Sequence, residues 1–244
     1  MPSRIHGFPS GVVEPIWLYP DDSALKAHSA YTGAKAGDMA AAIELVSDLA
    51  FPFLIQVRER LPSGACFVAP HAREATGDNA IPQVLAQACA MLAKGEADTD
   101  IVQISRVFHT GADPMERMAT RASFEGLVTP GKSHVLVDDV TTMGGTLAEL
   151  ANFIQIHDGF VAAVVVLVNA GRLKNLRPSP ALSRLIQSRH DHEIEEILGI
   201  QSTAFTANEA NYLIGFRSTD EIRNRLAKAR QETDRRLRSK GISR

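Results

Sequence analysis

Apolar and polar positions along this chain form blocks that predict strands separated by helices. Two continuous apolar runs, residues 135–137 and 160–168, have the β-branched composition of strands buried on both faces. Between them, from Leu147 onward, apolar residues recur at helical spacing. A further short strand is expected at 65–69, followed by a helix over 81–92. This order of elements predicts an α/β fold with a doubly wound, mostly parallel sheet.

The N-terminal part is less regular. Residues 1–32 are rich in Pro, Gly and aromatic residues, and a short edge strand is expected at 16–19. The spacing over 38–60 is helical, and Pro52 should kink that helix or split it in two.

The middle of the chain contains two more expected strands, 100–105 and 121–128. The segment 106–119 has a Gly, a Pro and no clear periodicity, so it is expected to be an irregular loop, a type that is usually functional or mobile. Beyond Asn169 four helices are predicted, over 181–187, 193–198, 208–216 and 219–238. We therefore divide the chain into a domain of residues 1–172 and a helical C-terminal extension, 173–244.

Composition narrows the class of protein. The chain has 244 residues, 45% hydrophobic and 22% charged, and a net charge of −2, which does not suit a protein that binds nucleic acid through its overall charge. Two cysteines, Cys66 and Cys89, are too few for a disulfide framework and indicate a reducing compartment. The start lacks the apolar core of a secretory signal, and the most apolar run, 159–168, is half the length of a membrane-spanning helix. These features predict a soluble cytoplasmic protein with no membrane partner.

The candidate ligand-binding residues are most concentrated in residues 134–150, HVLVDDVTTMGGTLAEL. An apolar strand runs into two adjacent carboxylates, Asp138 and Asp139, and then into a Thr/Gly loop at the start of a helix. Gly144 and Gly145 let a ligand approach the backbone amides, which with the helix dipole form an anion nest. Neither a GxxxxGK[ST] loop nor a GxGxxG fingerprint occurs. The pattern fits a ribose 5-phosphate unit, and the competing interpretation is an acidic N-cap on an ordinary helix.

The stretch 135–147, VLVDDVTTMGGTL, resembles the phosphoribosyl-pyrophosphate signature of the type I phosphoribosyltransferases. Residues 106–124, with an ERxxT-x3-F pattern, are similar to the competence-protein branch of that family. No match to the family is found in the first 60 residues or beyond about residue 172. The resemblance implies the type I phosphoribosyltransferase fold, in which residues 1–32 would form a small N-terminal hood within the domain 1–172.

The resemblance also implies residue roles. Asp138 and Asp139 would be catalytic and bind the ribose hydroxyls, with a Mg²⁺ ion close by, held directly or through water. The remaining residues would form three groups: the 5-phosphate loop Thr142, Met143, Gly144, Gly145 and Thr146; the pyrophosphate loop His71, Ala72 and Arg73; and a lid with Arg106, His109 and Thr110. Met143 departs from the family pattern, which often has a small or hydroxylated residue there.

Two functions follow as hypotheses. The first is a phosphoribosyltransferase that joins ribose 5-phosphate to a nitrogen nucleophile, a nucleobase or another amine, and releases pyrophosphate. The second is a non-catalytic, ligand-binding regulator whose basic tail contacts DNA or a protein. The tail, 221–244, has nine Lys/Arg against three acidic residues, although such a face is more often simply solvated. A helical extension would also suit a homodimer.

Overall fold

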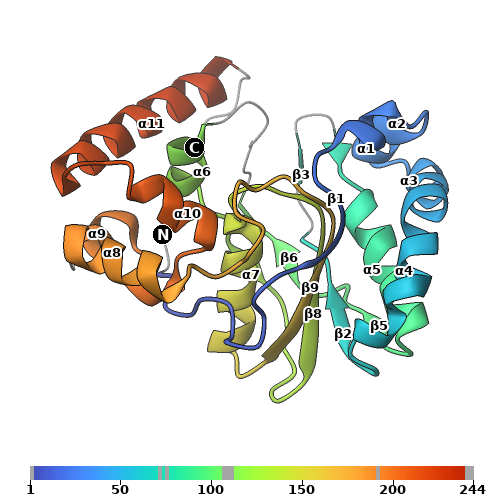
Figure 1. Cartoon of the computed structure of the whole chain (residues 1–244). Coiled ribbons are helices and arrows are strands. Elements are labelled where there is room, and N and C mark those ends of the chain that lie inside the picture. The colour runs from blue at the N-terminus through green and yellow to red at the C-terminus, as the bar shows by residue number, and fades with distance from the viewer. Residues whose placement is uncertain (1–2, 71–72, 75–76, 106–112, 191–192, 240–244) are drawn as a thin grey trace.

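The computed structural model describes residues 3–70, 73–74, 77–105, 113–190 and 193–239 (Figure 1). The strands are β1 (Ile16–Tyr19), β2 (Cys66–Val68), β3 (Arg73–Glu74), β4 (Gly77–Asp78), β5 (Glu96–Ala97), β6 (Val102–Gln103), β7 (Phe124–Glu125), β8 (Ser133–Thr141) and β9 (Phe160–Asn169). The α-helices are α1 (Ser23–Ala27), α2 (Tyr31–Lys35), α3 (Met39–Leu45), α4 (Phe51–Val57), α5 (Ile81–Leu92), α6 (Pro114–Ala119), α7 (Gly145–Ile156), α8 (Pro180–His190), α9 (Glu193–Leu198), α10 (Ala207–Leu213) and α11 (Thr219–Ser239).

The main sheet has five strands in the order β1-β9-β8-β2-β5, and every neighbouring pair is parallel. The central strand β8 pairs with β2 on one side, where Phe67 lies opposite Val135, and with β9 on the other, where Val137 lies opposite Val165. The α/β class with a mostly parallel, doubly wound sheet is therefore confirmed. The predicted edge strand 16–19 is also confirmed, since β1 closes the β9 side.

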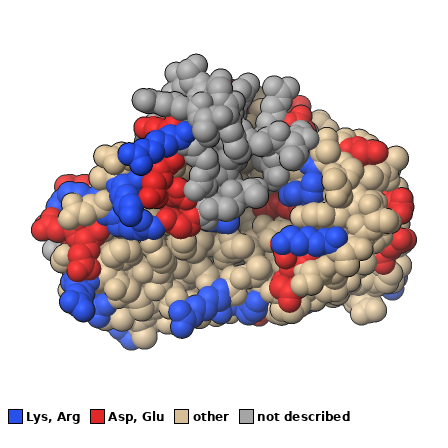
Figure 2. All heavy atoms as spheres, turned by 90° about the horizontal axis from the view of Figure 1, so that it is seen from above, with Lys and Arg blue, Asp and Glu red and all other residues tan. Residues whose placement is uncertain are grey.

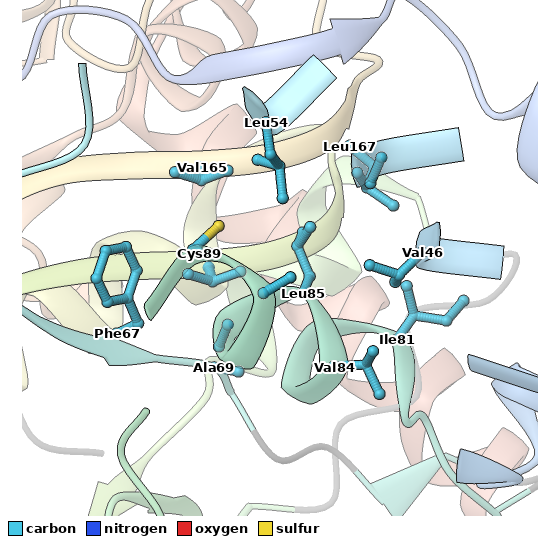
Figure 3. Packing of buried hydrophobic residues seen from close by; sticks show 14 of the residues in the cluster. Val46, Leu54, Phe67, Ala69, Ile81, Val84, Leu85, Cys89, Val165 and Leu167 are labelled. Atoms are coloured by element: carbon cyan, nitrogen blue, oxygen red, sulfur yellow. The ribbon is translucent and has the colours of Figure 1, made fainter. Parts of the chain in front are cut away.

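The two faces of the sheet are covered by different helices, because successive side chains of a strand point to opposite faces. Val135 and Val137 join a core with α3, α4 and α5, whereas Leu136 joins a core with α7. Figure 3 shows the first core, with Leu54 of α4 and Leu85 of α5 close to the strands. Both long strands are buried over almost their whole length, which explains their continuous apolar runs.

One helical run extends over Met39–Arg60 and comprises α3, the π-turn η1 (Val46–Ala50), α4 and the 3₁₀-turn η2 (Arg58–Arg60). The π-turn lies just before Pro52, as expected of a residue that has no amide proton for the helix ladder. The predicted interruption is thus confirmed. By length and composition alone the run could cross a membrane; in this fold its buried side chains pack against the sheet and α5.

Two of the expected strands are corrected by the structure. The segments 100–105 and 121–128 contribute only β6 and β7, two residues each, which pair antiparallel with each other outside the main sheet. The edge of the main sheet is instead β5, a two-residue strand too short to produce a periodic pattern.

The expected irregular loop 106–119 is corrected in its second half. Residues 106–112 lie outside the described part of the chain, but 114–119 form α6. A capping box starts this helix: Asp113 accepts the amide of Glu116, and the Glu116 side chain accepts the amide of Asp113. Pro114 occupies the first helical turn, where its missing amide proton costs nothing.

The four predicted C-terminal helices are confirmed as α8, α9, α10 and α11, within three residues at each end. They share a third apolar cluster with Met115 and Met118 of α6. The division of the chain at residue 172 and the N-terminal hood stay predictions. Within the proposed hood, residues 16–19 belong to the main sheet.

A buried ionic network fastens the N-terminal segment to the rest of the fold. Arg4 is fully buried, and its Nη2 lies 2.6 Å from Oε2 of Glu209 on α10, while its Nε lies 3.5 Å from Oε1 of Glu149 on α7. Arg121 donates from Nη1 to the same Glu149 oxygen at 3.1 Å and to the Gly199 carbonyl at 3.1 Å. Two positive and two negative groups from four separate segments therefore meet in the interior.

We expect Arg4→Ala to lower the free energy of unfolding by about 3–5 kcal/mol, because it leaves two buried carboxylates short of a counter-charge. Urea unfolding followed by circular dichroism measures this. Arg184→Ala, at an exposed position of α8, is the matched control and should change stability by less than about 0.5 kcal/mol. A loss below about 1 kcal/mol in Arg4→Ala would contradict the network's role.

Both cysteines are buried, and burial raises the pKa of the Cys66 and Cys89 thiols to about 12. We expect the native protein to react with a thiol reagent at pH 8 far more slowly than the urea-unfolded protein, because the thiolate is the reactive form. Ser10→Cys at an exposed position supplies a fast-reacting control. The thiols of the unfolded chain titrate near 9.0, whereas those of the folded chain titrate at about 12. The stability that the fold gains by keeping both thiols protonated is therefore complete below pH 9.0 and is lost as the pH rises toward about 12. Rapid reaction of both native thiols would disprove this assignment.

Candidate active site

The candidate site lies where the sheet reverses its winding order. The chain passes from β2 through α5 to β5 in one direction along the sheet, and from β8 through α7 to β9 in the other. Helices α5 and α7 consequently lie on opposite faces, and the loops that follow β2 and β8 diverge at the carboxyl edge between them. In open α/β sheets this switch point is the usual ligand site. The loops predicted to bind pyrophosphate and the 5-phosphate are these two loops.

The acid pair stands near the end of β8, and alternation along the strand gives the two residues different surroundings. Asp139 is 4% exposed, and its Oδ2 accepts hydrogen bonds from Lys35 Nζ at 3.2 Å and from Asn79 Nδ2 at 3.0 Å. Asp138 is half-buried, and its Oδ1 accepts the amide of Asp139 at 2.9 Å. Asp139 is thus a fixed, paired anion, and Asp138 is the carboxylate more open to a ligand.

Burial raises the pKa of Asp138 well above its usual range, and the neighbouring charge of Asp139 raises it further. A hydrogen bond from the Asp139 amide and the charge of Lys35 act in the opposite direction. Asp138 can therefore exchange a proton at a pH where an ordinary aspartate would stay ionised. A ligand with hydroxyl donors or a cation would favour its ionised form.

The loop after β8 has the backbone that a phosphate cradle requires. Gly144 adopts a left-handed conformation, with φ of 77°, and precedes α7 with no side-chain hydrogen bond capping the helix. Among the described residues, no side chain caps the first amides of this twelve-residue helix. Thr142, Met143, Gly144, Gly145 and Thr146 are all partly exposed, so the loop remains accessible.

Two segments remote in sequence support this loop. Arg117 of α6 donates from Nη1 to Thr142 Oγ1 at 3.0 Å. Thr206, the N-cap of α10, donates its hydroxyl to the Met143 carbonyl at 2.6 Å. The Met143 side chain packs against the third apolar cluster, which accounts for an apolar residue at the position where the family pattern often has a hydroxyl.

Of the other predicted site residues, only the backbone of Arg73 lies in the described part of the chain. Arg73 lies on β3, which pairs with β4, and nothing further is described of its side chain. His71 and Ala72 of the predicted pyrophosphate loop lie outside the described residues, as do Arg106, His109 and Thr110 of the predicted lid. Their roles stay predictions.

Sequence reasoning missed four residues that the fold brings to the site: Lys35, Asn79, Arg117 and Thr206. Only the last two lie in a recognisable local pattern. The capping boxes that begin at Asp113 and at Thr206 mark the starts of α6 and α10. Lys35 and Asn79 reach Asp139 from segments whose sequence carries no such signal.

A second group of possible metal ligands lies elsewhere, on the surface. His28, Glu44 and Asp48 have ligand atoms within 4.8 Å of one another. However, His28 Nδ1 accepts the amide of Ala30 at 3.2 Å, which leaves the proton on Nε2, facing Asp48 Oδ2 at 3.3 Å. That arrangement is a histidine–carboxylate hydrogen bond and not a prepared metal site.

Comparison with known proteins adds two relatives by sequence; no family model matches the chain. Protein TraN of Escherichia coli is 33% identical over 241 residues, covering 96% of this chain and 54% of that protein. An uncharacterized protein of Haemophilus influenzae is 33% identical over 129 residues, covering 52% of this chain and 29% of that protein. The chain therefore spans about half the length of the first relative and less of the second.

Solved structures to which the chain is similar include adenine phosphoribosyltransferases. The adenine phosphoribosyltransferase of Thermoanaerobacter pseudethanolicus is 18% identical, with a TM-score of 0.35 over 57% of this chain and 73% of that enzyme. The corresponding enzyme of Leishmania tarentolae is 12% identical, with a TM-score of 0.36 over 64% of this chain and 95% of that enzyme. These scores are too low to assign site residues or activity, so the fold class above rests on strand order and register.

Replacing Gly144 with Ala should destabilise the protein by about 1–2 kcal/mol, because a residue with a Cβ is strained in the left-handed region. The added methyl group itself would make only ordinary contacts, the nearest at 3.5 Å from Thr206 Cγ2. Gly11→Ala, with no atom within 4 Å of the added Cβ, is the control and should be nearly neutral. Thermal unfolding of both variants tests this, and equal melting temperatures would contradict the strain at Gly144.

Proposed function

We propose that this protein is a phosphoribosyltransferase that uses phosphoribosyl pyrophosphate and a nitrogen nucleophile. The observation that carries the proposal is the continuous unit at the switch point of the sheet. There a buried strand delivers Asp138 and Asp139, and the left-handed Gly144 leads into the uncapped start of α7. This unit coincides with the stretch that resembles the type I signature, 135–147. An acidic N-cap does not account for it, because both acids lie within the strand and the cap position is Gly144.

In the proposed reaction a bond forms between the acceptor nitrogen and C1 of the ribose, and the bond from C1 to the pyrophosphate oxygen breaks. Pyrophosphate leaves with the electron pair of that bond, and the nitrogen loses a proton. The amides of residues 144–146 and the hydroxyls of Thr142 and Thr146 would hold the 5-phosphate. Asp138 and Asp139 would accept hydrogen bonds from the ribose hydroxyls and stabilise positive charge that develops on the sugar.

The site has one carboxylate available to bind a magnesium ion. Asp139 is occupied by Lys35 and Asn79, so Asp138 is the carboxylate that could contact the ion directly or through water. Mg²⁺ is usually bound by one or two carboxylates, several waters and substrate phosphates, which suits a single available carboxylate. When bound, the ion would neutralise charge on the pyrophosphate.

The proposed regulator role depends on the basic tail, and in the first half of α11 three of the basic side chains are paired with acids, which weakens that half as a nucleic-acid surface. Arg223 pairs with Asp220 and Glu193, Arg225 pairs with Asp113, and Lys228 pairs with Glu232. On the face in Figure 2, blue and red side chains are interspersed at both ends of the molecule. Assays of binding and of turnover distinguish a regulator that only binds the ligand from an enzyme. A cytoplasmic location and a homodimer remain our expectations.

Isothermal titration calorimetry with phosphoribosyl pyrophosphate and magnesium tests the proposal. We expect binding in the wild type and a loss of about a hundredfold or more in the double variant Asp138→Asn, Asp139→Asn, because two charged hydrogen-bond acceptors are lost. Asp100→Asn, an exposed acid remote from the loop, should bind normally. Chelation of magnesium with EDTA should weaken binding.

Turnover is measured separately, as pyrophosphate released with a panel of purine, pyrimidine and amine acceptors. Release that depends on one acceptor and disappears in the double variant would support catalysis. Tight binding of phosphoribosyl pyrophosphate with no release for any acceptor would favour the regulator. No binding in the wild type would disprove both.

A further inference from the structure

Arg117 is the arginine of the ERxxT-x3-F pattern; it lies outside the predicted phosphate loop in sequence but contacts that loop in the structure. It lies on α6, whose residues Met115 and Met118 are buried in the third apolar cluster, so the orientation of the helix is fixed. From the same helix the half-buried Arg117 reaches Thr142 Oγ1. The packing of α6 therefore places the guanidinium beside the loop, where it donates a hydrogen bond to Thr142.

The hydrogen bond orients Thr142 for a ligand. Because the Thr142 oxygen accepts from Arg117 Nη1, the hydroxyl proton of Thr142 is directed away from the guanidinium. A threonine oriented in this way can donate its proton to an oxygen of a ligand bound at the loop. The guanidinium is planar and rich in N–H donors, a shape that matches phosphate oxygens.

Charge also favours an anion at this point. Burial lowers the pKa of Arg117, and the charge of Glu116 next to it partly offsets this effect. A guanidinium nevertheless stays protonated at every physiological pH. A half-buried cation beside the uncapped start of α7 is a place where a dianion gains from both the side chain and the backbone amides.

We propose that Arg117 is a binding residue for the phosphate monoester, supplying the side-chain cation that the loop 142–146 itself lacks; this inference rests on the proposed function. The loop sequence contains no lysine or arginine. In this assignment α6 delivers the positive charge and the loop delivers the amides and hydroxyls. The phosphate is then bound by groups from two segments that are separated by the β7 and β8 strands.

The test uses ribose 5-phosphate, titrated by calorimetry into the full chain. Arg117→Gln should weaken its binding about ten- to hundredfold, the range expected for a lost charged hydrogen bond. Arg117→Lys should lose less, since it keeps the charge without the planar fork, and Thr142→Val should lose several-fold. Arg184→Gln on the exposed face of α8 is the matched control and should bind as the wild type does.

The pH dependence separates a direct contact from a structural role. A phosphate monoester passes from dianion to monoanion near pH 6, so wild-type affinity should fall between pH 7.5 and pH 5. Arg117→Gln should show a smaller fall, because the cation that favours the dianion is gone. If Arg117→Gln bound ribose 5-phosphate with the affinity and the pH dependence of the wild type, the assignment would be overturned. If that variant does not fold, unchanged binding in both Arg117→Lys and Thr142→Val would overturn it.

The results that would contradict the proposed function differ from those that would contradict the Arg117 assignment. If the wild type binds ribose 5-phosphate and depends on Arg117 but does not bind phosphoribosyl pyrophosphate, the phosphoribosyltransferase proposal falls and the Arg117 assignment stands. If the wild type binds phosphoribosyl pyrophosphate and Arg117→Gln binds it equally well, only the assignment falls. A wild type that binds neither ribose 5-phosphate nor inorganic phosphate overturns both.

Discussion

The buried network of Arg4, Arg121, Glu149 and Glu209 is the constraint on which the arrangement around the site depends. Charged groups are expensive to bury unless each meets an opposite charge and further hydrogen bonds. Here the four charges come from the N-terminal segment, the segment before β7, α7 and α10, and they neutralise one another only when all four segments are in place. The network therefore stabilises one relative position of α7 and α10.

That position determines the shape of the loop after β8. A Cβ on Gly145 would lie 3.2 Å from Oε1 of Glu209, so the side chain that pairs with Arg4 also packs against the start of α7. Thr206 holds the Met143 carbonyl from the same helix. The C-terminal helices are thus one wall of the candidate site. Met143 is apolar because its side chain packs against those helices, while its backbone remains in the loop.

Much of the fold could be predicted because its main elements have strong local patterns. The β-branched run of β9 and the apolar periodicity of α5 give their bounds almost to the residue. The prediction of strands is wrong where a strand is too short to show a periodic pattern, as in β5 and the β6–β7 pair. Helix α6 has six residues and was missed as well, although the Asp113–Glu116 capping box was visible in the sequence.

The residues of the candidate site also divide into those with a local sequence pattern and those without one. Residues adjacent in the chain, from Asp138 to Thr146, could be identified because one strand, one turn and one helix start carry them all. The contacts that Lys35 and Arg117 make at the site could not be predicted, because only tertiary packing brings α2 and α6 to the carboxyl edge of the sheet. Lys35 offsets the charge of Asp139, and Arg117 adds positive charge at the phosphate loop. An anionic sugar phosphate next to two carboxylates requires both kinds of compensation. In the proposed function the motif would therefore specify where the ligand lies, and the cations from distant helices would offset its charge there.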